Sequence, residues 1–180
     1  MLTVVLAVAL GFPSSLGPWP WSPAARSHFD EGRKLQDQAL YPYAINQLQL
    51  SLSAEPHAEA ERALGECFAA MSQPLLASLH FARYVSAAPR DAEILNRLGS
   101  LQLELKQPEE AGRTFRALET LDAESAHTGL MQVELKLGER EYAARKYEAA
   151  LRHYSAALEL GHGDPRASDG IARCHLQMQR

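Results

Sequence analysis

Residues 58–90 read AEAERALGECFAAMSQPLLASLHFARYVSAAPR, and they hold two apolar stripes with a proline turn between them. Within each stripe, apolar residues recur at steps of three and four, the period of an amphipathic helix. They are Ala60, Leu64, Cys67, Phe68 and Met71 in the first stripe, and Leu75, Leu79, Ala82 and Val85 in the second. Pro74 stands at the start of the second stripe and Pro89 at its end. The segment therefore predicts a helix, a tight turn, a second helix and a short exit.

The spacing of small and large residues in this segment returns along the chain. Four times, a glycine is followed twelve residues later by an alanine and four residues after that by a large apolar residue. The sets are Gly32, Ala44 and Leu48; Gly65, Ala77 and Phe81; Gly99, Ala111 and Phe115; and Gly138, Ala150 and Tyr154. The glycines lie 33, 34 and 39 residues apart. Self-similarity on this scale predicts stacked copies of one small unit rather than a single globular core.

Glycine inside a helix needs a physical reason, because it destabilises the helix by about 1 kcal/mol relative to alanine. We interpret the recurring glycine and alanine as the place where the two helices of a unit approach each other closely. The large residue one turn beyond the alanine is then expected to fill the space beside that crossing.

The pattern resembles the tetratricopeptide repeat, a 34-residue helix–turn–helix unit. Leu64-Gly65, Phe68, Ala77 with Phe81, and Pro89 match almost every element of its consensus, and the first unit matches least. The resemblance implies an all-α, right-handed solenoid of antiparallel helix pairs. Four units are expected at about residues 25–57, 58–91, 92–125 and 131–164, followed by a capping helix over 165–180 within a repeat domain of residues 26–180. A truncated longer array is the alternative to a cap.

Five extra residues separate the third and fourth units, around Glu124 to Gly129. They predict either a longer loop or an extension of the first helix of the fourth unit.

The N-terminal residues 1–25 differ in composition from the rest. Met1 to Phe12 carry no charge, and this run is too short to span a bilayer as a helix. A Pro/Trp-rich stretch follows, with Ser22-Pro23-Ala24 as a small-residue site. We interpret the segment as a signal peptide for export to the periplasm or the extracellular space. No basic residue precedes the apolar run, so an untranslocated, cytoplasmic tail and an uncleaved anchor stay open as alternatives; an integral membrane span is not expected.

The sequence offers little for catalysis or cofactors. Cys67 and Cys174 belong to distant units, too far apart for a disulfide, and are expected to be buried free thiols; a reactive Cys174 is the alternative. The seven histidines form no metal-binding motif, and no phosphate-binding loop or nucleophile elbow occurs. A net charge of −4 does not favour nucleic acid. We therefore expect no enzyme activity, no metal and no cofactor.

In proteins of this resemblance, certain positions on the first helix of each unit face a concave groove. The corresponding residues here that we predict to contact a partner are Arg33, Arg62, Glu66, Asn96, Glu139 and Arg173. The resemblance implies a non-catalytic scaffold or adaptor that binds a partner protein or peptide in this groove. One alternative is a structural subunit of a cell-envelope or secretion assembly, which would use the ends and the convex face. Another is an accessory domain that acts beside a separately encoded enzyme.

Overall fold

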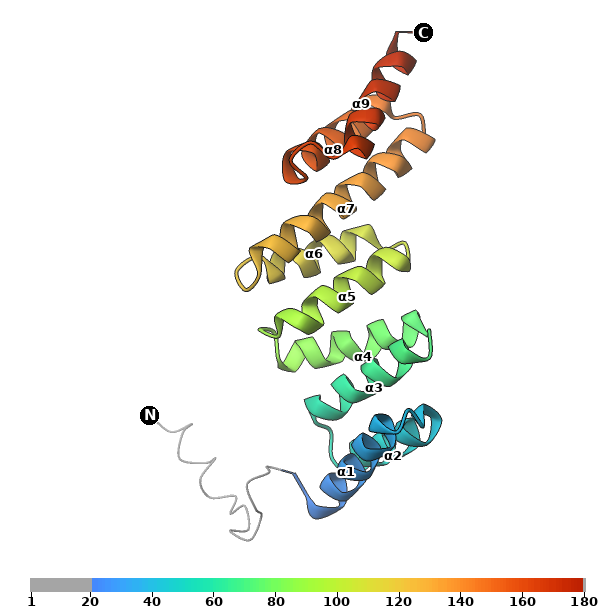
Figure 1. The fold of residues 1–180 in the computed structure, drawn as a ribbon, viewed down its shortest axis with the longest axis vertical. Helices are drawn as coiled ribbons and strands as arrows, with labels where there is room; N and C mark the ends of the chain where they lie inside the picture. The colour runs from blue at the N-terminus through green and yellow to red at the C-terminus, as the bar shows by residue number, and fades with distance from the viewer. Residues whose placement is uncertain (1–20, 180) are drawn as a thin grey trace, which may run out of the picture.

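A computed structural model of the protein describes residues 21–179, which form nine α-helices stacked in sequence order (Figure 1). The helices are α1 (Pro23–Asp37), α2 (Tyr41–Ala54), α3 (Ala58–Ala70), α4 (Pro74–Ala87), α5 (Ala92–Glu104), α6 (Pro108–Leu118), α7 (Ala123–Ala143), α8 (Tyr147–Leu160) and α9 (Pro165–Met178). Each odd-numbered helix packs on the next even-numbered helix as an antiparallel pair, and α9 packs on α8. The predicted all-α array of four pairs and a final helix is thereby confirmed.

The array has two unlike faces. Neighbouring odd-numbered helices contact one another between α1 and α3, between α5 and α7, and between α7 and α9. Within residues 21–179, no two even-numbered helices make such a contact. Because helices lie closer together on the inner side of a curved stack, the odd-numbered helices form the concave side. We call this surface the odd-helix face.

The start of each helix follows from local chemistry. Every odd-numbered helix has a polar N-cap side chain that accepts a hydrogen bond from a backbone N–H of the first turn. These N-caps are Ser22, His57, Asp91, Asp122 and Asp164. The helices α2, α4 and α6 lack such a cap and instead have proline in their first two positions, where its missing N–H leaves no hydrogen bond unmade.

In each of the four sets of recurring residues, the glycine lies against the large apolar residue of the same set, within the core. The alanine and the large residue of every set are at most 1% exposed. A Cβ atom on the glycine of each set would lie 2.5–2.8 Å from the large residue of its own set. Helix contact this close requires glycine, since real Cβ atoms essentially never lie within 3.0 Å of another heavy atom.

The five extra residues before the fourth unit are helical, because α7 runs for 21 residues from Ala123. The N-terminal half of α7 packs on α6, and its C-terminal half packs on α8. A second glycine, Gly129, makes the first of these contacts possible. A Cβ atom there would lie 2.4 Å from the Phe115 ring, which Gly99 already approaches from its own unit. The added turns therefore form a long central helix that joins the third unit to the fourth (Figure 1).

Side chains nineteen residues apart join the two helices of three units. The pairs are His28 Nδ1 with Gln47 Oε1 at 2.8 Å, His80 Nδ1 with Glu61 Oε2 at 2.6 Å, and His153 Nδ1 with Glu134 Oε2 at 2.7 Å. Three of the seven histidines are thus accounted for by contacts within a unit.

Most of the predicted leader, residues 1–20, lies outside the described residues, and its last five residues lie inside them. Trp21 is buried and stacks on His57 with ring centroids 3.8 Å apart, and Ser22 caps α1. The backbone N–H of Ser22 also donates to Glu55 Oε2 at 2.7 Å. Because α1 begins at Pro23, the boundary that we predicted at residue 25 falls inside this helix. Trp21 and Ser22, which precede the helix, already take part in the fold. None of the helices within residues 21–179 has both the length and the apolar character needed to span a bilayer.

Candidate functional site

The residues predicted to contact a partner lie on all five odd-numbered helices. Arg33 is on α1, Arg62 and Glu66 on α3, Asn96 on α5, Glu139 on α7, and Arg173 on α9. Ion pairs join Arg33, Arg62 and Glu66 into one group near the N-terminus. The other three residues lie nearer the C-terminus, and no ion pair among the described residues links them directly to the first group.

Arg62 is the centre of the N-terminal group. Its Nε donates to Glu66 at 3.0 Å, its Nη1 to Asp91 at 2.7 Å and its Nη2 to Glu93 at 2.8 Å. The guanidinium also lies over the Tyr84 ring, whose hydroxyl donates to Asp91 at 2.8 Å. Burial by itself lowers the pKa of Arg62, but its hydrogen bonds and the nearby carboxylates outweigh burial and raise it. With three carboxylate partners on α3 and at the start of α5, Arg62 joins two units of the array.

Glu66 continues this network toward α1. It accepts hydrogen bonds from Arg33 Nη1 and from Gln36 Nε2, each at 2.9 Å. Burial alone raises the pKa of Glu66, and the hydrogen bonds from Gln36, Arg62 and Arg33 reverse the direction and lower it. Arg33, Arg62 and Glu66 are therefore engaged with one another, and the N-terminal half of the odd-helix face carries charges that are already neutralised.

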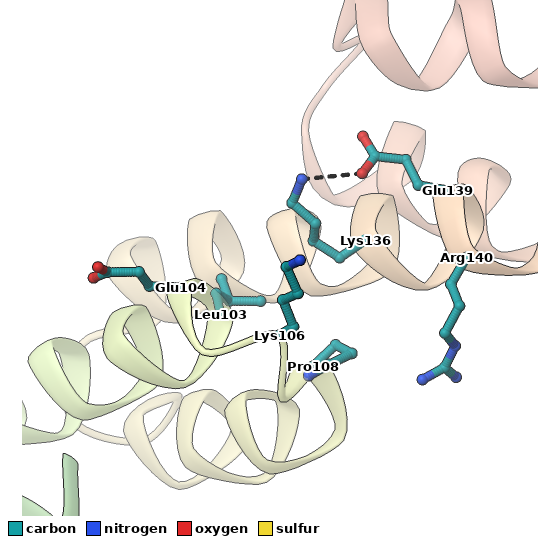
Figure 2. A pocket seen from close by; sticks show the side chains of 7 residues that line it. All are labelled: Leu103, Glu104, Lys106, Pro108, Lys136, Glu139 and Arg140. Carbon is teal, nitrogen blue, oxygen red and sulfur yellow. Dashed lines mark hydrogen bonds and ion pairs between the residues drawn. The ribbon is translucent and has the colours of Figure 1, made fainter. Parts of the chain in front are cut away.

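The C-terminal half of the odd-helix face is hollowed. A hollow of about 570 Å³ is lined by Leu103, Glu104, Lys106, Pro108, Lys136, Glu139 and Arg140 (Figure 2). A second of about 270 Å³ shares four of these residues and adds Ser100, Gln132, Leu135 and Arg166. A third of about 190 Å³ shares Ser100 and Gln132 with the second and reaches Asn96 and Thr128. We call the three adjoining hollows together the α5–α7 trough.

The predicted site residues of the C-terminal half have looser partners. Asn96 and Glu139 line the trough, and Glu139 pairs with Lys136 at 3.0 Å. Arg173 pairs with Asp169 at 2.9 Å on its own helix and lies over the Tyr142 ring. The repeat positions that we used on the first helix of each unit do not include Lys106, Gln132 or Lys136. Lys106 lies in the turn after α5, and the trough depends on how far α7 extends along α5.

Tyr154 lies beneath α7 and α9 and has an unusual hydroxyl. The residue is 1% exposed, and its hydroxyl has no hydrogen-bond partner within the described part of the chain. Burial raises the pKa of Tyr154, and the Arg173 charge opposes this. The phenol therefore stays protonated and neutral at physiological pH.

Ser51, His57 and Glu59 resemble a catalytic triad in composition but not in arrangement. His57 Nε2 lies 2.8 Å from Ser51 Oγ, and Glu59 lies 3.5 Å from Nδ1. However, Nδ1 accepts the Ala60 N–H as the N-cap of α3, so Nε2 carries the proton and donates to Ser51. Ser51 is fully buried and donates in turn to the Ala25 carbonyl. Because His57 donates to the serine instead of accepting from it, these residues hold α1, α2 and α3 together and do not form a nucleophile.

The two cysteines are fully buried, as the sequence led us to expect. Burial raises the pKa of the Cys67 thiol to about 11, and it also raises that of Cys174. Since the thiolate is the reactive form, these shifts argue against a reactive Cys174. Among the described residues, no group of three or more histidine, cysteine or acidic side chains could hold a metal ion.

The stacked pairs, their glycine–aromatic contacts and the hollowed odd-helix face define the tetratricopeptide fold. Solved structures with this fold support the assignment at low sequence identity. A crystal structure of MamA matches with a TM-score of 0.56 and 19% identity, over 87% of this chain and 83% of that one. YrrB, a TPR protein with an unusual peptide-binding site, matches with a TM-score of 0.57 and 19% identity, over 81% and 73%. A tetratricopeptide repeat protein from Parabacteroides merdae ATCC 43184 matches with a TM-score of 0.55 and 18% identity, over 88% and 61%.

No protein-family model matches the sequence, and no curated protein matches it. The likeness is therefore one of fold.

Proposed function

We propose that this protein is a non-catalytic adaptor that binds a peptide or protein segment on its odd-helix face. The observation that carries the proposal is the α5–α7 trough, which is the hollowed part of the concave side. Binding pockets are concave and join an apolar floor to a few polar groups, and the trough combines Leu103 and Leu135 with exposed polar side chains. YrrB, which shares the fold, is itself described by its peptide-binding site.

An obstruction variant tests the surface. Ser100 is exposed on α5 and lines two of the three hollows, so Ser100→Arg places a long side chain in the trough. The matched control is Ala117→Arg, at an exposed position of α6 outside the trough. We expect the first variant to reduce binding to a displayed library of random twelve-residue peptides at least ten-fold, and the second to leave it unchanged. Equal binding by both variants would remove the odd-helix face as the site.

A structural subunit of a cell-envelope or secretion assembly is the second candidate, and one observation favours it. Leu75, Leu76 and Leu79 are exposed on α4, with Leu75 64% exposed, and Tyr43 on α2 is 67% exposed. Contiguous exposed apolar side chains commonly mark surfaces that bind other proteins. Under this hypothesis the purified chain forms oligomers of defined size that Leu75→Lys disrupts. Sedimentation that shows a monomer for both forms would argue against it.

We also propose export of the chain, on the strength of the uncharged apolar run over Met1 to Phe12. Cleavage after Ala24 would remove the Trp21–His57 stack and the Ser22 cap, so a cleavage site before Trp21 fits the fold better. N-terminal sequencing of the natural protein tests this: an intact Met1 on a cytoplasmic product would contradict export.

A further inference from the structure

The first turns of α4 carry a cluster of exposed leucines. Leu75, Leu76 and Leu79 are between 37% and 64% exposed. Leu79 lies three residues after Leu76 and four after Leu75, so the three side chains share one side of the helix. We call these three residues the α4 patch. Because contact with water is unfavourable for apolar surface, a cluster of this kind is typical of a surface that another group covers.

The apolar character of these positions is confined to the N-terminal half of the array. The α4 patch occupies the positions two before, one before and two after the recurring alanine, Ala77. The same positions are Pro42, Tyr43 and Asn46 on α2, Glu109, Glu110 and Arg113 on α6, and Glu148, Ala149 and Arg152 on α8. Toward the C-terminus the residues at these positions thus become mostly charged. We infer that the group that covers the α4 patch belongs to the N-terminal half.

The chain enters the fold in the same half, at Trp21. The Trp21 ring is buried and stacks on His57, and the backbone N–H of Ser22 donates to Glu55. Glu55 and His57 form the junction between α2 and α3. Residues 1–20 therefore join the array at a fixed point beside this junction.

The α4 patch lies within reach of that point. The 13 residues of α3 make it about 20 Å long. Since α4 runs antiparallel to α3, its first turns lie beside the end of α3, about one helix length from His57 (Figure 1). The eight residues from Pro13 to Pro20 can span at most about 26 Å when extended. This connection is long enough to bring the apolar run of residues 1–12 to the α4 patch.

We propose that, in the chain that keeps its leader, the apolar run Met1 to Phe12 packs on the α4 patch and covers it. The run has no charged side chain, so it covers the leucines without burying a charge. Over α6 the same run would bury Glu109 and Arg113. The short connection to Trp21 makes the contact intramolecular and gives the run a high effective concentration at the patch. A chain without the leader presents the α4 patch to other proteins. The inference goes beyond the proposed function and does not depend on peptide binding at the odd-helix face.

The test measures how fast a maleimide labels a cysteine placed in the α4 patch. The full chain is made by cell-free synthesis without membranes, so that it keeps its leader. Leu79→Cys reports on the patch, and the matched control Arg152→Cys lies at the equivalent exposed position of α8. The two native cysteines are fully buried and react slowly.

The leader is altered in the same full chain by Leu6→Asp with Leu10→Asp. We expect Leu79→Cys to react about ten-fold more slowly with the native leader than with the altered one, because the tethered run covers the patch. Arg152→Cys should react equally fast with either leader. Equal labelling of Leu79→Cys in the two chains would overturn the inference.

Protection by a second copy of the chain gives a different result. Protection by the chain's own leader should be unchanged by about hundred-fold dilution, whereas protection by another copy is lost. Loss on dilution would assign the α4 patch to self-association and refute the inference.

A cross-link tests the contact directly. A short bismaleimide should join the cysteines of Ala7→Cys with Leu79→Cys within one chain, but not those of Ala7→Cys with Arg152→Cys. Absence of the first cross-link would also contradict the inference. None of these variants alters the α5–α7 trough, so such a failure would leave the proposed peptide-binding function standing, and Ser100→Arg tests that function separately.

Discussion

Gly129 and Gly112 are both buried glycines within helices, and the structure predicts that the same substitution has opposite effects at the two positions. At Gly129, a Cβ atom would lie 2.4 Å from two atoms of the Phe115 ring. At Gly112, the nearest atom to a Cβ would be Val133 Cγ1 at 3.5 Å, an ordinary contact. Gly112→Ala therefore serves as the matched control for Gly129→Ala.

The magnitude follows from two opposing terms. Replacing glycine by alanine in a helix stabilises it by about 1 kcal/mol. At Gly129 the new methyl group is about 1 Å short of the space it needs, and Phe115 cannot move away because Gly99 approaches its other side. Overpacking of this kind costs about 1–3 kcal/mol, and we expect the upper end because the ring is held on both sides. The net effect is a loss of about 2 kcal/mol, against a gain of up to about 1 kcal/mol for Gly112→Ala.

Thermal unfolding followed by circular dichroism measures both effects. For a chain of this length, about 1 kcal/mol corresponds to about 2–4 °C in Tm. Gly129→Ala is thus expected to lower Tm by about 4–8 °C and Gly112→Ala to raise it by about 2–4 °C. Adding Phe115→Leu to Gly129→Ala should cost less than the sum of the two single changes, because the smaller side chain relieves the clash. A Gly129→Ala variant at least as stable as the wild type would refute the close contact between α6 and α7.

Three further predictions concern single side chains. Burial lowers the pKa of His57 below its ordinary value of 6.5. The contribution of His57 to the free energy of unfolding is therefore fully present above pH 6.5 and falls as pH drops below it, because the imidazole then binds a proton more readily in the unfolded chain than in the folded one. Melts followed by tryptophan emission at about pH 7.5 and 5.5 should show this loss, and it should shrink in His57→Asn. Arg62→Met should lower the free energy of unfolding, measured in urea, by about 2 kcal/mol, because Glu66 and Asp91 lose a partner. The control Arg113→Met should change it by no more than about 0.5 kcal/mol. Equal losses in the two variants would contradict the network. Tyr154→Phe should be neutral or stabilising by up to about 1 kcal/mol, since the hydroxyl makes no hydrogen bond among the described residues, and a larger loss would mean that it has a partner in solution.

The helices themselves could be predicted from local patterns. Pro74 and Pro108 mark the first residues of α4 and α6, and Asp164-Pro165 marks the start of α9. The backbone conformation of the turns between paired helices carried no comparable signal. Ala39, Ser72, Lys106 and Arg145 occupy these turns with positive φ, where glycine is the residue that a sequence pattern leads one to expect.

The site was less predictable than the fold. Arg33 and Arg62 lie on the odd-numbered helices α1 and α3, and their charges are taken up by Glu66, Asp91 and Glu93. Asp91 and Glu93 are about thirty residues from Arg62 in the chain, so neither spacing nor composition identifies them as its partners.

The sequence by itself determined the repeating unit, because helix period, proline positions and the glycine–alanine spacing are local properties that recur. It also determined that Gly138 approaches Tyr154 within the fourth unit, since both lie in one copy of the pattern. Only the tertiary structure decided how the third unit meets the fourth. The five extra residues could have looped out, but they extend α7, and Gly129 then lies against Phe115 while Lys136 lies across from Lys106. That arrangement depends on contacts between units, which no single copy of the repeat contains, and it is what creates the trough.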